Sequence, residues 1–399
     1  MPIEGAQTYA VIPLSVQKDE ESYLVGDIDS GEFCQFPEVG VRILEMLRSG
    51  ESAPAISAEL AAEGGETFDV DGFVDELMAI GFVHPVGHRP SPAPAQIGSR
   101  DSRRIFYVDP RLARAVFAWP MLGCYFAIIA YALFCAIVDP RLRVNPNAFY
   151  TDTNRTALLL LILILSFIEV CLHETGHMLA AARRGVRSRY GIGNRLWMVV
   201  AESDLTGILA LPKAQRYFPM LAGLLVDFLC AALLTLTLRA LLGAGAGGFA
   251  IQLVQAVILQ IFIGVTWQFN IFVKTDVYFV LCNYFSCPDL DRDARHYLRG
   301  LLYRATRGRL GEALSAARPR NLHGLRAFTA IWLFGRLGSL VVLFGVFLPT
   351  MAQYVESAVS LLRGPPAAFW MACDTIAYVA IMLTMLSAGM YLWLTQKEA

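Results

Sequence analysis

Six long apolar runs are the feature that most constrains how this 399-residue chain can fold. A helix needs about 20 mostly apolar residues to cross roughly 30 Å of hydrocarbon. Apolar residues make up 56% of the chain and charged residues 17%, against about 45–50% and about 25% in soluble domains. The pattern predicts a polytopic α-helical membrane protein with about six spans. We place them at 115–138, 156–182, 217–243, 251–281, 327–350 and 368–394.

Arginines between these runs orient the predicted spans. Loops on the cytoplasmic side of a membrane carry an excess of Lys and Arg. One group of arginines precedes the first span (Arg100 to Arg114), one follows the second (Arg183 to Arg195), and nine follow the fourth (Arg292 to Arg326). Residues 1–30 are mixed polar without an apolar signal segment, so we expect the N-terminal part to stay where it is made. The pattern therefore predicts that both termini are cytoplasmic.

Residues 1–86 have the pattern of a small α+β domain. Two strand-like stretches come first, with turn residues at Gly26, Asp29 and Gly31, and three short amphipathic helices and a strand-like Phe82-Val83 follow. This order predicts a winged-helix-like arrangement, joined by a linker at 87–113 to a membrane domain at 114–399 with its core at 150–300. The predicted strands are Tyr9–Leu14 and Ser22–Phe36, and the predicted helices are Val39–Leu47, Ala53–Ala61 and Val70–Ile80.

The second span contains the sequence His173-Glu174-Thr175-Gly176-His177. Two histidines four residues apart lie one turn apart on the same helix face, so both imidazoles can reach one Zn²⁺. Glu174 is then placed to take a proton from a water molecule that the metal activates. The alternative is a polar helix end at the membrane surface. Ionisable residues inside a span are rare and usually functional, which favours the metal site.

A catalytic zinc ion usually has three protein ligands and one open position. The candidate for the third ligand is Asp276, in a polar interruption of the fourth span that also contains Asn270 and Lys274. Only a broken helix or one that lines a cavity tolerates such residues. The alternative is an ion pair between Lys274 and Asp276 at the membrane interface.

Two further acids lie inside predicted spans. Glu169 comes one turn before His173, and Asp227 lies in the third span. Histidines that bind metals usually donate their second ring N–H to a carboxylate or a carbonyl, so either acid can support a metal ligand from behind. A hydrogen bond between helices without any such role is the alternative for both.

The His-Glu-x-Gly-His element, followed about a hundred residues later by Asn270 and Asp276-Val277-Tyr278, resembles the site-2-protease family of intramembrane zinc metalloproteases. Within that family it is most similar to the peptide zinc metalloproteases of bacterial peptide-maturation systems. The resemblance covers roughly 150–300 and implies that Asp276 is the third zinc ligand and that Asn270 lies near the substrate. It departs from the family pattern at Val277, where a Gly is usual, and at Leu224 and Asp227, where a Gly-Pro…Asn element is common.

The segment Tyr190–Leu211 is neither helical in pattern nor apolar enough to span a membrane. We expect short strands or a re-entrant hairpin beside the zinc. A protease can use such a strand edge to hold an extended substrate.

The N-terminal domain has a resemblance of its own. An apolar helix from Phe36 to Gly50, a second short helix at Ala53–Leu60 and the sequence Gly81-Phe82-Val83 resemble the PqqD-like peptide-binding domain. The resemblance implies that it binds the leader of a precursor peptide as an added strand. A DNA-binding winged helix is the alternative, but Val70–Ile80 carries three acids, which disfavour contact with phosphate, and the net charge is −1.

Together these features predict a bacterial inner-membrane zinc metallopeptidase that cleaves a ribosomally made, leader-bearing precursor peptide at the cytoplasmic side. Glu174 is expected to act as general base and then as proton donor. Expected partners are the peptide substrate, the lipid bilayer, other maturation or export proteins and a second copy of the chain, with no nucleic acid. Two alternatives stay open: release of membrane-tethered regulators by site-2-type proteolysis, and a non-proteolytic peptide-binding or export accessory.

Overall fold

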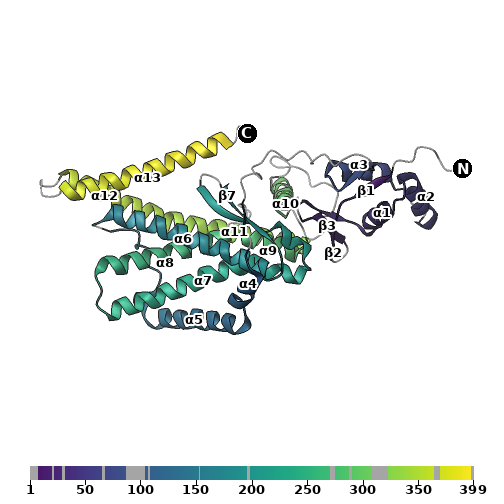
Figure 1. Ribbon diagram of the computed structural model, residues 1–399. Helices are drawn as coiled ribbons and strands as arrows, with labels where there is room; N and C mark the ends of the chain where they lie inside the picture. Colours follow the sequence, from purple (N-terminus) through teal and green to yellow (C-terminus); the bar gives the residue numbers. More distant parts are fainter. Residues whose placement is uncertain are drawn as a thin grey trace. The chain divides into compact units, whose positions relative to one another are not determined.

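The chain is mostly helical and divides into two compact units. The first unit comprises Met1–Phe106, Val186–Arg189 and Asp204–Arg216; the second comprises Tyr107–Gly185, Tyr190–Ser203 and Tyr217–Ala399. The computed structural model, drawn in Figure 1, describes residues 8–19, 22–28, 32–64, 68–86, 104–106, 108–151, 153–195, 198–269, 275–286, 290–306, 322–363 and 369–396.

Two small antiparallel sheets and three helices form the N-terminal part of the first unit. Strand β1 pairs with β5, and β2, β3 and β4 form a sheet in that order. The three predicted helices and the predicted strand after Gly81 are confirmed. The bounds are β1 Tyr9–Val11, β2 Ser15–Asp19, β3 Ser22–Asp27, β4 Glu32–Phe36, α1 Glu38–Arg48, α2 Ala53–Gly64, α3 Val70–Ala79 and β5 Val83–Pro85.

Two details of the three-stranded sheet β2-β3-β4 differ from the prediction. Strand β2 was not predicted, because Ser15–Asp19 has little apolar alternation. Gly26 was predicted to mark a turn but lies inside β3, where it pairs with Phe33 of β4. A Cβ atom at Gly26 would collide with the Phe33 ring, so the glycine serves the packing of this strand pair. The predicted turn residues Asp29 and Gly31 lie outside the described residues.

The core of this unit depends on how α3 ends. Gly81 has φ +82°, and the N–H of Phe82 donates to the carbonyl of Leu77 at 2.9 Å, as in a Schellman motif. This turn directs Phe82 into the interior, where it is fully buried together with Leu47 and Ile56.

The first unit takes in more of the chain than the predicted domain at 1–86. The 3₁₀ helix η3 (Thr206–Ala210) and the residues up to Arg216 belong to it. The buried carboxylate of Asp19 lies 3.6 Å from Lys213 and 3.7 Å from Arg216, which is itself buried. The predicted linker at 87–113 falls largely outside the described residues, apart from strand β6 (Arg104–Phe106) and the start of α4.

Among the described residues, five helices are long and apolar enough to cross a membrane by length and composition. The predicted sixth span at 368–394 coincides with helix α13, which is apolar over the part of it that is described in full, Phe369–Met385. The five are Trp119–Val138, Arg155–Ala182, Lys213–Gly243, Gly248–Gln268 and Arg326–Glu356. The second unit contains α4 Pro110–Val116, α5 Trp119–Val138, η2 Pro140–Leu142, α6 Arg155–Ala182, most of α7 Lys213–Gly243, α8 Gly248–Gln268, α9 Asp276–Tyr284, α10 Leu290–Ala305, α11 Leu322–Val342, the π-helical turn η5 Leu343–Phe347, α12 Leu348–Arg363 and α13 Phe369–Gln396.

The predicted fourth span, 251–281, is two helices. Helix α8 ends at Gln268 and α9 begins at Asp276. Gln268 holds the two ends together: its carbonyl accepts a hydrogen bond from the Thr275 hydroxyl at 2.6 Å, and its side-chain oxygen accepts one from the Asp276 N–H at 3.2 Å. The break places Asp276 in the first turn of a new helix.

Helix α6 lies among the other long helices of the second unit. Figure 1 shows it beside α8 and α7, and shared apolar clusters join it to α5, α7 and α8. Segments β7 (Ser188–Arg195) and β8 (Met198–Asp204) are neighbouring strands, which confirms the strands predicted within Tyr190–Leu211.

A cap from α13 closes the N-terminal end of α6. The Asp374 carboxylate accepts from the backbone N–H groups of Arg155 at 2.8 Å and Thr156 at 3.1 Å, which have no partner within their own helix. The Arg155 side chain is buried, donates to Thr375 Oγ1 and lies 5.8 Å from the ring centroid of Tyr354. Through this cap the last helix holds the start of α6.

Replacing Asp374 by alanine should destabilise the protein by about 2 kcal/mol, because two partly buried N–H groups lose their acceptor. The measurement is the unfolding midpoint of the full chain in detergent. The control is Glu356→Ala, which removes an exposed acid of α12 and should change the stability by about 0.5 kcal/mol or less. Equal midpoints for the two variants would show that the cap contributes no stability.

Candidate metal centre

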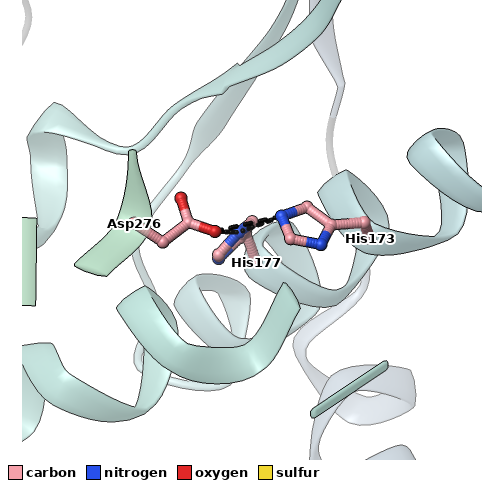
Figure 2. A group of neighbouring side chains, drawn as sticks. All are labelled: His173, His177 and Asp276. Atoms are coloured by element: carbon pink, nitrogen blue, oxygen red, sulfur yellow. Dashed lines mark hydrogen bonds and ion pairs between the residues drawn. The ribbon is translucent and has the colours of Figure 1, made fainter. Parts of the chain in front are cut away.

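Helix α6 places His173 and His177 on one face, both buried, and the first turn of α9 brings Asp276 to them. Figure 2 shows the three side chains pointing toward one another. The two Nε2 atoms lie 3.1 Å apart, and Asp276 Oδ2 lies 3.0 Å from His173 Nε2 and 3.1 Å from His177 Nε2. The three residues predicted as metal ligands therefore converge on one point.

The size of this triangle suits a zinc ion. Zn²⁺ binds imidazole nitrogens at about 2.0–2.1 Å and carboxylate oxygens at about 2.0–2.2 Å. For sides of 3.0–3.1 Å, a point about 2.05 Å from all three atoms lies about 1 Å out of their plane and gives ligand–metal–ligand angles of about 97°. These angles are about 12° smaller than the tetrahedral value, so the three ligands lie on one side of that point and leave a fourth position on the side away from the triangle.

Hydrogen bonds behind the two rings fix which nitrogens face that point. His177 Nδ1 lies 2.7 Å from the carbonyl oxygen of Pro219, which can only accept, so this nitrogen carries the proton. His173 Nδ1 lies 2.8 and 2.9 Å from the two carboxylate oxygens of Asp227 and donates in the same way. In the neutral rings both Nε2 atoms are then unprotonated, and the lone pair of each faces the Asp276 carboxylate oxygen. Three acceptors about 3 Å apart are stable when a cation lies between them.

Two glycines let α7 approach these histidines. A Cβ atom at Gly223 of α7 would lie 2.6 Å from His173 Nε2. A Cβ atom at Gly176 of α6 would lie 2.7 Å from a methyl carbon of Val226 and 3.0 Å from the carbonyl oxygen of Ala222. The absence of side chains at both positions brings Pro219 and Asp227 within hydrogen-bonding distance of the rings.

Glu174 follows His173 in the chain and contacts strand β8. Its Oε2 atom accepts from the N–H of Ser203 at 2.8 Å and from the Ser203 hydroxyl at 2.7 Å. The hydroxyl of Tyr190, in β7, lies 3.4 Å from Cys171 Sγ, one turn before Glu174. Burial and the hydrogen bond to Cys171 raise the pKa of Tyr190 to about 12. The predicted hairpin segment therefore contacts α6 beside the candidate base.

The remaining predicted residues are placed as follows. Asp227 contacts His173 directly, and Glu169 lies close enough to Asp227 to interact with it electrostatically, so it neighbours the site through that residue. Asn270 lies outside the described residues, as does Lys274 and with it the alternative ion pair to Asp276.

Sequence reasoning missed Ser203, Pro219 and Gly223. A proline inside an apolar span was a usable signal, since it marks a helix with an irregular backbone. Ser203 and Gly223 have no local signal, because their roles depend on contacts with residues far away in the chain.

Comparison with known proteins gives no relative. No family model, no curated protein and no solved structure matches this chain. A function is therefore inferred from the chemistry of the site itself.

Purified without chelator, the full-length protein should hold about one zinc per chain, and His173→Ala and Asp276→Ala should both lose it. Asp227→Asn should weaken zinc binding about 10- to 100-fold, because it removes the carboxylate behind His173. Elemental analysis and competition with a chelating dye measure both effects. The control is Asp139→Ala, an acid at the start of η2 that pairs with Arg141 of the same short helix. Zinc retained in Asp276→Ala would exclude Asp276 as a ligand.

Gly223→Ala should reduce zinc binding, because the added methyl carbon would occupy the space of the two imidazoles. The matched control is Gly264→Ala in α8, where a Cβ atom meets nothing within 4 Å. Zinc content and the unfolding midpoint of both variants are measured in detergent. Full zinc occupancy in Gly223→Ala would contradict the close approach of α7 to the rings.

Proposed function

We propose that this chain is an intramembrane zinc metallopeptidase of the site-2-protease type that cleaves a ribosomally made, leader-bearing peptide at the cytoplasmic side of the bacterial inner membrane. The observation that carries the proposal is the convergence of His173, His177 and Asp276 within 3.1 Å, with Glu174 next in the chain to the first of them. Three ligands with an open fourth position are the arrangement of catalytic zinc sites, whereas structural zinc sites are closed by four.

In the proposed reaction, different residues bind the metal, transfer the proton and orient the histidine rings. His173, His177 and Asp276 would hold the zinc, which when bound polarises the scissile carbonyl and lowers the pKa of water. Glu174 takes a proton from the attacking water while the water oxygen forms its bond to the carbonyl carbon. When the carbon–nitrogen bond breaks, Glu174 gives that proton to the leaving amine. Asp227 and the Pro219 carbonyl keep the two rings oriented throughout.

The position of the site along α6 supports cleavage near one face of the membrane. His173 and His177 are nine and five residues from the last residue of the helix, Ala182, or about 14 and 8 Å at 1.5 Å per residue. Arg183 and Arg184 follow directly, and clusters of arginine favour the cytoplasmic side. A peptide arriving from the cytoplasm would have a short path to the zinc.

The first unit supports the choice of a peptide as substrate. Its three-stranded sheet has the order β2-β3-β4, so β2 and β4 are the outer strands, and an extended leader can pair with an outer strand. Helix α3 carries Asp71, Asp75 and Glu76, which disfavour a nucleic acid as the ligand. Strands followed by three short helices are also the order of the PqqD-like domain that the sequence resembles.

The test is cleavage of dye-labelled casein, an unstructured polypeptide, by the purified protein in lipid vesicles. The wild type should cleave it, and 1,10-phenanthroline should stop cleavage until zinc is added back. Glu174→Gln should keep its zinc and lose about 10²- to 10⁴-fold in rate, because the general base is removed.

The controls separate the outcomes. Cleavage that persists in Glu174→Gln would point to a contaminating protease or a different base. A zinc-loaded wild type that cleaves neither casein, nor a leader-bearing peptide, nor a single-span protein would sink the peptidase proposal. The peptide-binding accessory would then be the better account.

A further inference from the structure

The contact between Glu174 and Ser203 assigns a role to a residue that no sequence pattern singled out. Both donors of Ser203, its backbone N–H at 2.8 Å and its hydroxyl at 2.7 Å, bind the same carboxylate oxygen, Oε2. One residue thus holds one oxygen of the carboxylate from two directions. Within the part of the chain that the structure describes, no hydrogen bond to the other oxygen, Oε1, is present, so this oxygen is available for a proton from water.

This contact is held in place by a second one. Tyr190 in β7 binds Cys171, which lies three residues before Glu174 and on a neighbouring part of the α6 surface. The Thr175 hydroxyl donates to the Cys171 carbonyl at 2.6 Å in the same helix turn. Both strands of the β7–β8 segment are therefore tied to the turn of α6 that carries the base.

The orientation of a general base decides how well it works. A carboxylate on a three-bond side chain rotates freely in water, and a proton is transferred only when an oxygen lies at hydrogen-bonding distance from it. Two donors from one backbone position restrict both the swing of the Glu174 side chain and the rotation of its carboxylate plane.

We propose that Ser203 is a positioning residue for Glu174: by binding Oε2 through its N–H and its hydroxyl, it keeps Oε1 directed toward the substrate water. This role rests on the proposed peptidase function. If it holds, the β7–β8 segment orients the general base in addition to any contact that it makes with the substrate.

The test compares Ser203→Ala, Ser203→Thr and the control Ser339→Ala in the full-length protein. The Ser339 hydroxyl also donates a hydrogen bond, in its case to the backbone carbonyl of Gly335 in α11 at 2.9 Å. With casein as substrate, Ser203→Ala should lower kcat about 10-fold and leave KM unchanged, because the hydroxyl is lost but the N–H remains. Ser203→Thr keeps both donors and should restore the rate. Zinc content and the unfolding midpoint should match the wild type in all three variants.

A second readout does not depend on proteolysis. Acetohydroxamate binds a metal with its two oxygens and needs a correctly placed carboxylate to accept its proton, so its affinity reports the orientation of Glu174. With Co²⁺ in the site, binding is followed by the visible absorption of the metal. Ser203→Ala should bind acetohydroxamate about 10-fold more weakly, in the same direction as Glu174→Gln.

The outcomes are distinct. Ser203→Ala that behaves like Ser339→Ala in both readouts would overturn the positioning role, and so would a faster rate, which would mean that Ser203 restrains the base. A wild type that binds acetohydroxamate but cleaves no substrate would contradict the peptidase function. The positioning of Glu174 by Ser203 would then be decided by the hydroxamate affinities of the variants alone. If Ser203→Ala does not fold, Ser203→Cys replaces it: the thiol is nearly the same size but a weaker donor, so this variant should lose more rate than Ser203→Thr, and a rate equal to the wild type would overturn the role.

Discussion

The close approach of α7 to α6 is the constraint on which the rest of the site depends. Gly176 and Gly223 have no side chains to separate the two helices, and Gly223 lies directly against the imidazoles. Because the helices are this close, the Pro219 carbonyl reaches His177 and the Asp227 carboxylate reaches His173. The helix pair thus fixes the tautomers of both rings, and only Asp276 has to come from elsewhere in the chain. A larger residue at either glycine would disturb the ligands and the groups that hold them.

Buried polar groups along α6 are paired with partners from other helices. At the metal end, His173 is hydrogen-bonded to Asp227 and His177 to the Pro219 carbonyl, both of α7. At the other end, Asp374 and Thr375 of α13 satisfy Arg155 and the first N–H groups of the helix. In an apolar environment an unpaired polar group costs several kcal/mol, so these pairs specify which helices α6 packs against. The helix that carries the histidines is therefore held at both ends.

Local sequence patterns predicted the features that depend on neighbouring residues, namely the short helices and the spacing of the metal ligands. The limits of α1, α2 and α3 were found within three residues, because amphipathic spacing and glycines mark them. The spacing of His173 and His177 was enough to place both on one face, and a polar interruption was enough to point to Asp276. Contacts between distant residues were out of reach: the glycine in β3 opposite Phe33, the inclusion of 204–216 in the first unit, and Ser203 beside Glu174. Each of these is decided by a partner that no window of the sequence contains.

The cap on α6 has a consequence for the order in which the protein is made. Asp374 follows Arg155 by 219 residues, so at about 5–20 residues per second it leaves the ribosome about 10 to 45 s later. During that interval the first turn of α6 lacks the carboxylate that completes it, although both histidines have already been synthesised. Completion of the first turn of α6 thus waits for the last helix, and a chain that stops short of residue 374 leaves α6 uncapped.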